Sequence, residues 1–381
     1  MISLFLCTYM DILNYFGQPF TMLYVFKIKL MYDFNTQSKH IIIMKRNYLL
    51  CTLFVFMFSF IQAQTITFVS EQTNKPLPKV SVFGKNGNIL AYSDIDGKID
   101  KNSLSQDQEK FNIVYDNFSV ATLAYSDFEQ NTIRLNDQVK EIETVVIKNT
   151  KPAKYIFIKG NFNSYVTVNK KLNCYADGVV TYIFDNKTKK LKSTNVEQYR
   201  VYRLEDPKNE KKHTDSWDYG SSLSVPEMKN VGNIDAYKKK NTTLKELKGQ
   251  RKDEVEITGE FLQQKEFAIF GFRFFDLKGI VNIAFEPDSK KTLKDLLEYN
   301  EIDFLKLKHK TEKDYNQLIA YSNFYTTELG FTNDNDLEKV KFKKEHSNYT
   351  AKFWQSPSFP NMQTIFSSFF KDDLKEQENK K

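Results

Sequence analysis

The stretch IFIKGNFNSYVTV, residues 156–168, alternates between apolar and polar side chains along most of its length. The apolar set is Ile156, Ile158, Phe162, Val166 and Val168, and the intervening polar set is Lys159, Asn161, Asn163 and Thr167. A period of two residues predicts a β-strand. One apolar and one polar face predict a long, half-buried strand in an antiparallel sheet.

Residues C-terminal to this stretch continue the pattern. Further strands are expected at ADGVVTYIFDN, NVEQYRVYRL, EVEITGEF, IVNIAF and VKFKKE. The Phe-rich run 267–275 is apolar on both faces, which predicts a central strand covered on both sides. We therefore expect residues 155–375 to form a larger antiparallel β-rich domain with a few helices, followed by a polar tail at 376–381.

Two segments have helical spacing. Leu293, Leu296 and Leu297 predict a short helix. A clearer amphipathic pattern near the C-terminus is formed by Met362, Ile365, Phe366, Phe369, Phe370 and Leu374. Such a helix usually packs on its own domain. The alternative is contact with a partner or a membrane surface through Phe366 and Phe370.

The strand pattern fails between residues 206 and 252, where the chain is polar and rich in charge. A long segment of this kind inside a compact domain is often a lid or binding loop. Trp217 and Tyr219 are its candidate ligand contacts. The alternative is a solvated insertion whose two aromatic side chains pack against the sheet.

A smaller β domain is expected N-terminal to residue 149. Ile66 and Phe68 alternate with threonines, which predicts a first strand, and Asn86-Gly87 and Asp96-Gly97 are typical of tight turns between strands. FNIVY and TIRL predict two more strands, and ETVVIKN is expected to close the domain before a linker at 149–154.

This first domain has a family resemblance. The series TNKPLPKVSVFGKNGNILAYSDIDGKI (73–99) and IRLNDQVKEIETVVI (133–147) resembles the carboxypeptidase-regulatory-like domain of exported Bacteroidota proteins. The resemblance covers residues 64–148 and implies a transthyretin-like β-sandwich with an accessory rather than catalytic role. The stretch GNFNSYVTVNKKLNCYADGVVTYIF, followed by QYRVYRL, resembles the uncharacterised C-terminal region that follows this domain in flavobacterial proteins. This second resemblance covers most of residues 154–355 and implies no known active site.

The N-terminus predicts export. After Met44, two basic residues precede an apolar run from Tyr48 to Ile61 that ends close to Ala63. This order is typical of a secretory signal peptide at 44–63, and the run is shorter than the roughly 20 residues of a membrane-spanning helix. Residues 1–43 are interpreted as an upstream extension, with an N-terminal membrane segment as the alternative, so the true start is Met1 or Met44. We expect a periplasmic, outer-membrane-associated or secreted protein that retains no transmembrane helix.

Composition argues against several functional classes. The net charge is +7 over 381 residues. The sequence does not show the one-sided basic cluster that is typical of nucleic-acid-binding proteins. Only Cys174 follows the signal peptide, so neither a disulfide nor a multi-cysteine zinc site is expected. His309 and Glu312 form an H-x-x-E pair, with His346 further on, but they lie in a lysine-rich stretch that is unlike a zinc hydrolase. We predict no metal, no cofactor and no catalytic residue.

These features predict a two-domain, mainly β, non-catalytic binding or assembly module at the cell envelope. Its expected partners are outer-membrane or periplasmic proteins or lipid. One alternative is a periplasmic lipid or lipoprotein carrier with a pocket in a curved sheet. Another is a hydrolase whose site includes the 206–252 loop. A deep apolar pocket would favour the carrier, and convergence of His309, Glu312 and His346 would favour the enzyme.

Overall fold

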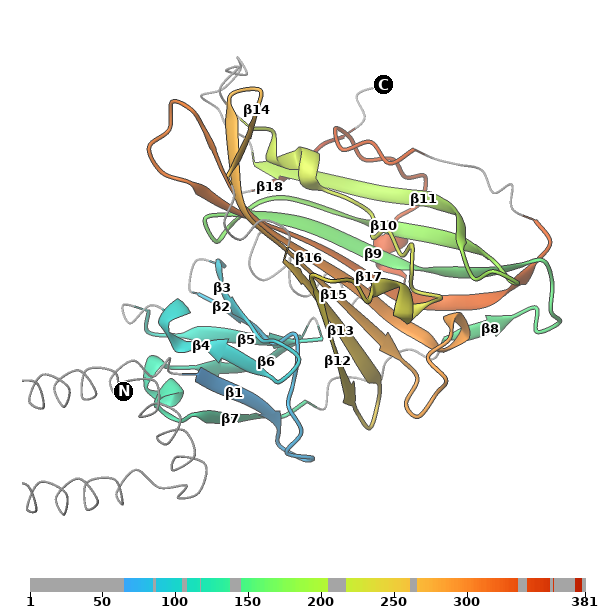
Figure 1. Cartoon of the computed structure of the whole chain (residues 1–381), viewed down its shortest axis with the longest axis horizontal. Helices are drawn as coiled ribbons and strands as arrows, with labels where there is room; N and C mark the ends of the chain where they lie inside the picture. The colour runs from blue at the N-terminus through green and yellow to red at the C-terminus, as the bar shows by residue number, and fades with distance from the viewer. Residues whose placement is uncertain are drawn as a thin grey trace, which may run out of the picture. The chain divides into compact units, whose positions relative to one another are not determined.

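The structure is a computed structural model and shows a mainly β protein (Figure 1). The residues it describes are 65–84, 87–104, 108–116, 118–137, 145–204, 217–260, 266–334, 341–356, 359 and 374–378. These residues form 18 strands and six short 3₁₀ helices, and no α-helix occurs among them. The expected fold class is confirmed, except for its few helices. No helix in the described ranges is long and apolar enough to cross a membrane.

The first domain consists of two sheets that share one core. Its strands are β1 (Thr65–Ser70), β2 (Ser81–Phe83), β3 (Ile89–Tyr92), β4 (Lys98–Asp100), β5 (Phe111–Tyr115), β6 (Phe118–Leu123) and β7 (Thr132–Leu135). One sheet has the order β4-β1-β7 and the other β3-β2-β5-β6. Phe68 from the first sheet and Val82 and Phe111 from the second are fully buried in one cluster. These strands therefore form a β-sandwich, with 3₁₀ turns η1 (Lys101–Ser103) and η2 (Tyr125–Glu129) at its edges.

The segment expected to close this domain joins the second domain instead. Strand β8 (Val146–Lys148) pairs in parallel with residues Glu328–Gly330 of the large sheet. Val145 likewise packs against the core of that sheet. The large sheet therefore begins before residue 149, ahead of the expected linker.

The second domain is built on one 11-stranded sheet. Its other strands are β9 (Tyr155–Val168), β10 (Lys171–Asp185), β11 (Leu191–Leu204), β12 (Thr242–Lys248), β13 (Asp253–Glu260), β14 (Phe267–Ile269), β15 (Phe272–Phe285), β16 (Leu296–His309), β17 (Asn316–Thr332) and β18 (Leu374–Glu376). The main order is β12-β13-β15-β16-β17-β9-β10-β11-β18, with β14 beside β15. The strand predicted at 156–168 is confirmed as β9, which lies between β17 and β10.

Both faces of the sheet are buried at strand β9, which corrects the expectation of a half-exposed strand. We call one face the apolar face, since Ile158, Phe162 and Phe324 contribute to its large core. The opposite face is polar at its centre and carries one rung of paired side chains in register: Asn282, Asn300, Asn323, Asn163 and Asp177. Asn163 is only 1% exposed. Alternation alone could not show that the polar face is covered.

The Phe-rich run 267–275 is a hairpin rather than one central strand. β14 and β15 pair through Ile269 and Phe272, and the chain turns at Phe270 and Gly271, both with positive φ. Phe270 is 91% exposed. The prediction of a strand covered on both sides was therefore wrong for this run.

Four other elements differ from their predictions. Thr292 and Asp295 close a capping box around a single 3₁₀ turn, η5 (Leu293–Asp295), and the chain then enters β16 at Leu296, so no helix forms there. Residues 341–345 of VKFKKE are not in a strand. Part of the 206–252 segment does form a strand, β12, and Leu374 lies in β18 rather than a helix. The remaining residues of the predicted C-terminal helix, including Phe366 and Phe370, lie outside the described residues, as does the signal segment.

Candidate functional site

A strap, residues 217–237, crosses the apolar face of the large sheet. It contains the 3₁₀ turns η3 (Tyr219–Ser222) and η4 (Ile234–Tyr237). Its side chains Leu223, Met228 and Val231 are fully buried against that face. The buried Tyr182 hydroxyl donates to the carbonyl of Pro226 at 2.6 Å. The backbone N–H of Ser224 donates to the hydroxyl of Ser164 at 3.1 Å. These bonds fix the middle of the strap to strands β9 and β10.

The two predicted ligand contacts lie at the start of the strap. The ring of Trp217 packs edge-on against Phe272 and Phe274, with centroid distances of 5.1 and 5.4 Å. Tyr219 also packs against the core of the large sheet. Both aromatic side chains therefore pack against the sheet, as the alternative of a solvated insertion expected, but the middle of the strap that follows them is buried rather than solvated.

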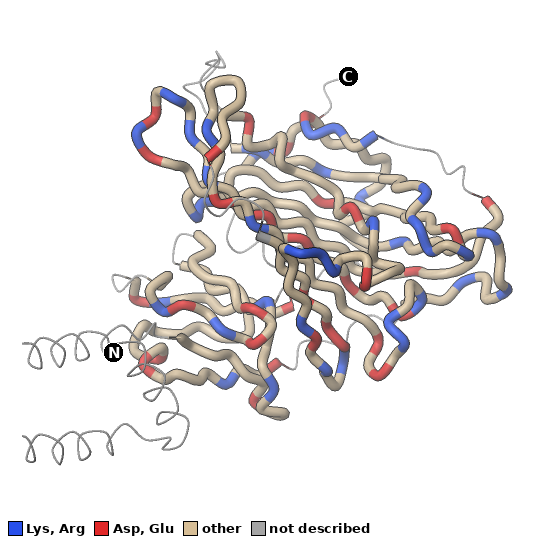
Figure 2. The backbone as a smooth tube through the Cα atoms, in the orientation of Figure 1, with Lys and Arg blue, Asp and Glu red and all other residues tan. Residues whose placement is uncertain are grey.

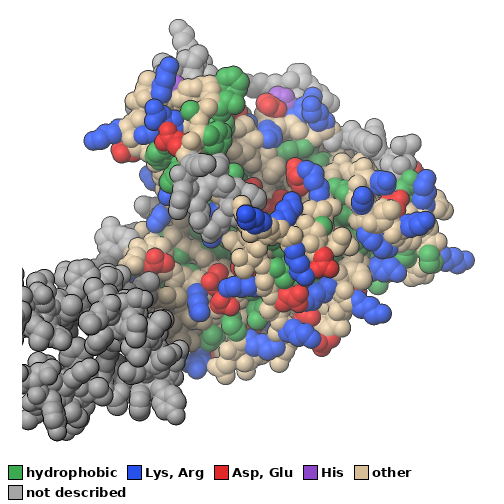
Figure 3. Space-filling model, viewed as in Figure 1, with side chains coloured by type: hydrophobic (Ala, Val, Ile, Leu, Met, Phe, Trp, Pro, Cys, Tyr) green, Lys and Arg blue, Asp and Glu red, His purple; other side chains and the backbone are tan. Residues whose placement is uncertain are grey.

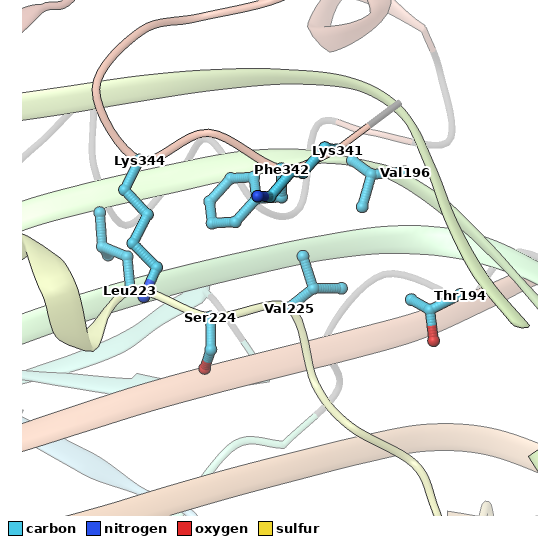
Figure 4. Close-up of a pocket in the computed structure, with 8 residues that line it drawn as sticks. All are labelled: Thr194, Val196, Leu223, Ser224, Val225, Lys341, Phe342 and Lys344. Carbon is cyan, nitrogen blue, oxygen red and sulfur yellow. The ribbon is translucent and has the colours of Figure 1, made fainter. Parts of the chain in front are cut away.

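A pocket of about 440 Å³ opens between the strap, strand β11 and the segment 341–344 (Figure 4). Its lining residues are Thr194, Val196, Leu223, Ser224, Val225, Lys341, Phe342 and Lys344. In Figure 4 the strap supplies Leu223, Ser224 and Val225 on one side, while Lys341, Phe342 and Lys344 lie on the other. Three segments far apart in the sequence therefore form one site.

The pocket combines an apolar wall with two ammonium groups. Phe342 is held edge-on against Tyr199 and Phe162, with centroid distances of 4.9 and 6.0 Å. Lys344 donates to the backbone carbonyl of Ser221, which holds its side chain across the strap. A preformed apolar surface next to a fixed positive charge suits a ligand with an apolar body and an acidic group.

Sequence reasoning found only part of this site. The strap lies inside the 206–252 segment that was expected to bind a ligand, but its contacts are Leu223 and Val225 rather than Trp217 and Tyr219. The Lys341–Lys344 side was missed because its alternating residues predict a strand. The pairing of this segment with the strap depends on tertiary packing that the pattern does not encode.

A partly buried carboxylate, that of Glu301, lies against the strap. Glu301 accepts a hydrogen bond from the Tyr299 hydroxyl at 2.8 Å and one from the backbone N–H of Glu227 at 3.3 Å. The Tyr299 hydroxyl also lies 3.1 Å from that of Tyr237, at the end of the strap. Burial raises the pKa of Glu301 to about 7, against the opposing effect of the Tyr299 hydrogen bond.

The raised pKa of Glu301 predicts that the stability of the protein depends on pH. Because its pKa is raised on folding, its contribution is fully present below about pH 4.5 and is lost as pH rises through about 7. We expect the free energy of unfolding to fall by about 2 kcal/mol from this group between pH 5 and 8. Urea denaturation at both pH values should show a smaller fall for Glu301→Gln. Identical pH dependences of the two proteins would contradict the assignment.

The candidate zinc residues do not come together. His309 Nδ1 lies 2.7 Å from the Thr311 hydroxyl, and the Glu312 carboxylate accepts from the His309 backbone N–H at 2.7 Å, so both cap a turn. No group of three or more His, Cys, Asp or Glu in the described ranges could hold a metal ion. Burial raises the pKa of the Cys174 thiol to about 12, which makes it a poor nucleophile at neutral pH.

Comparisons with known proteins identify no family. No protein-family model matches the chain, and no curated protein matches it. A solved structure described as lipid–protein interactions in lipovitellin is 8% identical, with a TM-score of 0.26. The match covers 50% of this chain and 27% of that one, and likeness at this level carries no argument about fold or function. The resemblance of residues 64–148 to the carboxypeptidase-regulatory-like domain stays a prediction.

Proposed function

We propose that this chain is an exported, non-catalytic binding module of the cell envelope whose pocket holds a small amphiphile with an acidic group. The pocket at the strap is the observation that carries the proposal. Its volume of about 440 Å³ lies in the range of small-molecule sites, roughly 300–1,000 Å³. Val196, Val225 and Phe342 offer the apolar surface, and the nearby lysines offer the charge.

The chemistry of the lining favours binding over catalysis. Among the described residues, the lining side chains include no His, Cys, Asp or Glu, the groups that most often act as bases and nucleophiles. The Ser224 hydroxyl lies 3.0 Å from that of Ser322, so its contact is with another serine rather than a base. Export and an accessory role draw their support from the predicted signal peptide and from the family resemblance.

A carrier for lipid is the second candidate, because the same apolar wall suits an acyl chain. The two candidates differ in what happens to the ligand after binding. A carrier releases it to an acceptor membrane, whereas a binding module retains it. The hydrolase alternative gains no support from the described part of the 206–252 segment, where Trp217 is packed into the core.

Calorimetric titration of delipidated protein with dodecanoate tests the proposal. We expect one binding site, and weaker binding of uncharged dodecanol because it lacks the acidic group. Val225→Asp places a carboxylate in the apolar wall, and repulsion plus desolvation should weaken dodecanoate binding about tenfold or more.

The matched control is Val146→Asp, at a valine that is 51% exposed and outside the pocket. This variant should bind dodecanoate like the unaltered chain. Equal affinities for Val225→Asp and Val146→Asp, or no binding by any of the three proteins, would overturn the proposed site.

A further inference from the structure

The tip of the β14–β15 hairpin presents apolar side chains to solvent. Phe267, Ile269 and Phe270 are 44, 47 and 91% exposed, and they account for three of the seven large exposed apolar side chains among the described residues. Figure 3 shows this tip as a green projection at the top of the view, where Figure 1 places β14. Phe267 stacks on Phe274 at a centroid distance of 4.8 Å, but within the described part of the chain the tip keeps a concentrated apolar surface exposed.

The turn at this tip is strained in a way that packing does not explain. Phe270 and Gly271 have φ values of 50° and 83°, as in a two-residue type I′ turn. Such turns favour Asn-Gly, and the left-handed region is sterically unfavourable for a bulky aromatic residue. The chain therefore keeps a large apolar side chain at a position where neither backbone preference nor burial favours it. Strain of this kind is typical of functional positions.

Lysines lie beside the apolar tip. The backbone N–H of Lys310 donates to the carbonyl of Gly271 at 2.8 Å, which holds the β16–β17 loop against the turn. Lys310 and Lys313 are exposed, and neither forms a carboxylate ion pair with the described residues. Lys308 lies 4.6 Å from the ring of Tyr315. In Figure 2 the hairpin tip is tan, and the neighbouring loop carries the charged segments.

Two acidic side chains beside the hairpin form ion pairs. The Glu266 carboxylate pairs with Arg273 at 3.1 Å and also accepts from the Tyr315 hydroxyl. Asp276 pairs with Lys306 at 2.6 Å. The β16–β17 loop itself carries Lys308, Lys310 and Lys313 against Glu312 and Asp314, a net charge of +1, and the Glu312 carboxylate accepts from the backbone N–H of His309.

We propose that the β14–β15 tip inserts into the head-group region of a lipid membrane that contains anionic lipid. Apolar side chains at the end of a narrow hairpin can enter the interface, and adjacent lysines gain attraction to anionic head groups. A second protein is a poorer match, because a stable interface buries about 800 Å² per partner and this tip offers only three apolar side chains. The proposal goes beyond the pocket, which is lined by other residues.

Vesicle co-sedimentation with the whole mature chain tests the inference. We expect binding to vesicles of mixed phosphatidylglycerol and phosphatidylethanolamine, and about tenfold weaker binding to phosphatidylcholine alone. Phe270→Asn should reduce the partition coefficient about tenfold, since a phenyl group leaves the interface. Asn suits the left-handed turn, so the variant should unfold at the same or a higher temperature.

Ile147→Ser is the matched control, at an apolar side chain that is 64% exposed and away from the hairpin. It should leave vesicle binding unchanged. The inference is overturned if Phe270→Asn sediments with anionic vesicles like the unaltered chain, or if the unaltered chain does not bind them. It is also overturned if the unaltered chain dimerises in solution and Phe270→Asn makes it monomeric, because the tip would then serve self-association.

Discussion

Lys252→Met is expected to lower the free energy of unfolding by about 3–5 kcal/mol, because it leaves buried carboxylates without their main partner. Lys252 Nζ lies 2.8 Å from Glu298 and 2.9 Å from Asp116. Its side chain is 7% exposed and that of Glu298 is 6% exposed. Chemical denaturation of the variant at neutral pH measures the loss.

The cluster around Lys252 links the sandwich to the large sheet. Lys79, from the sandwich, lies 2.9 Å from Glu298 and 3.2 Å from Glu254, and Asp116 follows strand β5. Burial opposes ionisation of Glu298, but Lys252 and Lys79 hold its pKa well below the usual range. Burial raises the pKa of Asp116 despite its contact with Lys252. Two lysines thus pair with three carboxylates. Loss of either lysine leaves buried carboxylates without enough positive charge and should strongly destabilise the protein.

A nearby exposed lysine supplies the control. Lys248 Nζ lies 3.6 Å from Asp288, and its side chain is 74% exposed. Exposed ion pairs contribute about 0–1 kcal/mol, so Lys248→Met should change stability little. If Lys252→Met and Lys248→Met destabilise the protein equally, the buried cluster does not hold the two domains together as described.

Phe324→Ala is expected to lower the free energy of unfolding by about 3–5 kcal/mol through loss of apolar contacts and the cavity left behind. Phe324 is fully buried on the apolar face and meets the ring of Tyr182 edge-on at 5.1 Å. Gly160 lies against the same ring, since a Cβ there would be 2.7 Å from two of its carbon atoms. This tight fit leaves little freedom to fill the cavity. The unfolding midpoint in urea is the measurement.

Phe270→Ala is the matched control for this variant, because it removes the same side chain from an exposed position. It should leave stability unchanged or slightly raised, since it relieves a bulky left-handed residue. Equal losses in Phe324→Ala and Phe270→Ala would contradict the placement of Phe324 in the core.

Patterns that repeat within one element were predictable from the sequence. β9 follows directly from its period of two, and the tight turn at Gly97 has the positive φ of 72° that its Asp-Gly pair predicts. The burial of Asn163 was not predictable, because it depends on what packs against the polar face. Alternation shows which residues share a face but does not show whether solvent reaches it.

The missed elements have local physical causes. The β14–β15 hairpin has Phe270 where Asn would signal a turn, so the run was interpreted as continuous. The spacing of Leu293, Leu296 and Leu297 fits an α-helix. It fits a single 3₁₀ turn that leads into a strand equally well, so these three residues do not distinguish the two structures. The pocket was only partly predictable because it joins the strap to a segment more than 100 residues away, a proximity that no local pattern reports.

Mass spectrometry of small molecules extracted from the protein purified from the cells that naturally produce it tests the proposed binding function most directly. We predict an acidic amphiphile in near-stoichiometric amount with the unaltered chain and with Val146→Asp, and a large reduction with Val225→Asp. An extract from the unaltered chain that contains no such molecule, or the same amount as the Val225→Asp extract, would contradict the account.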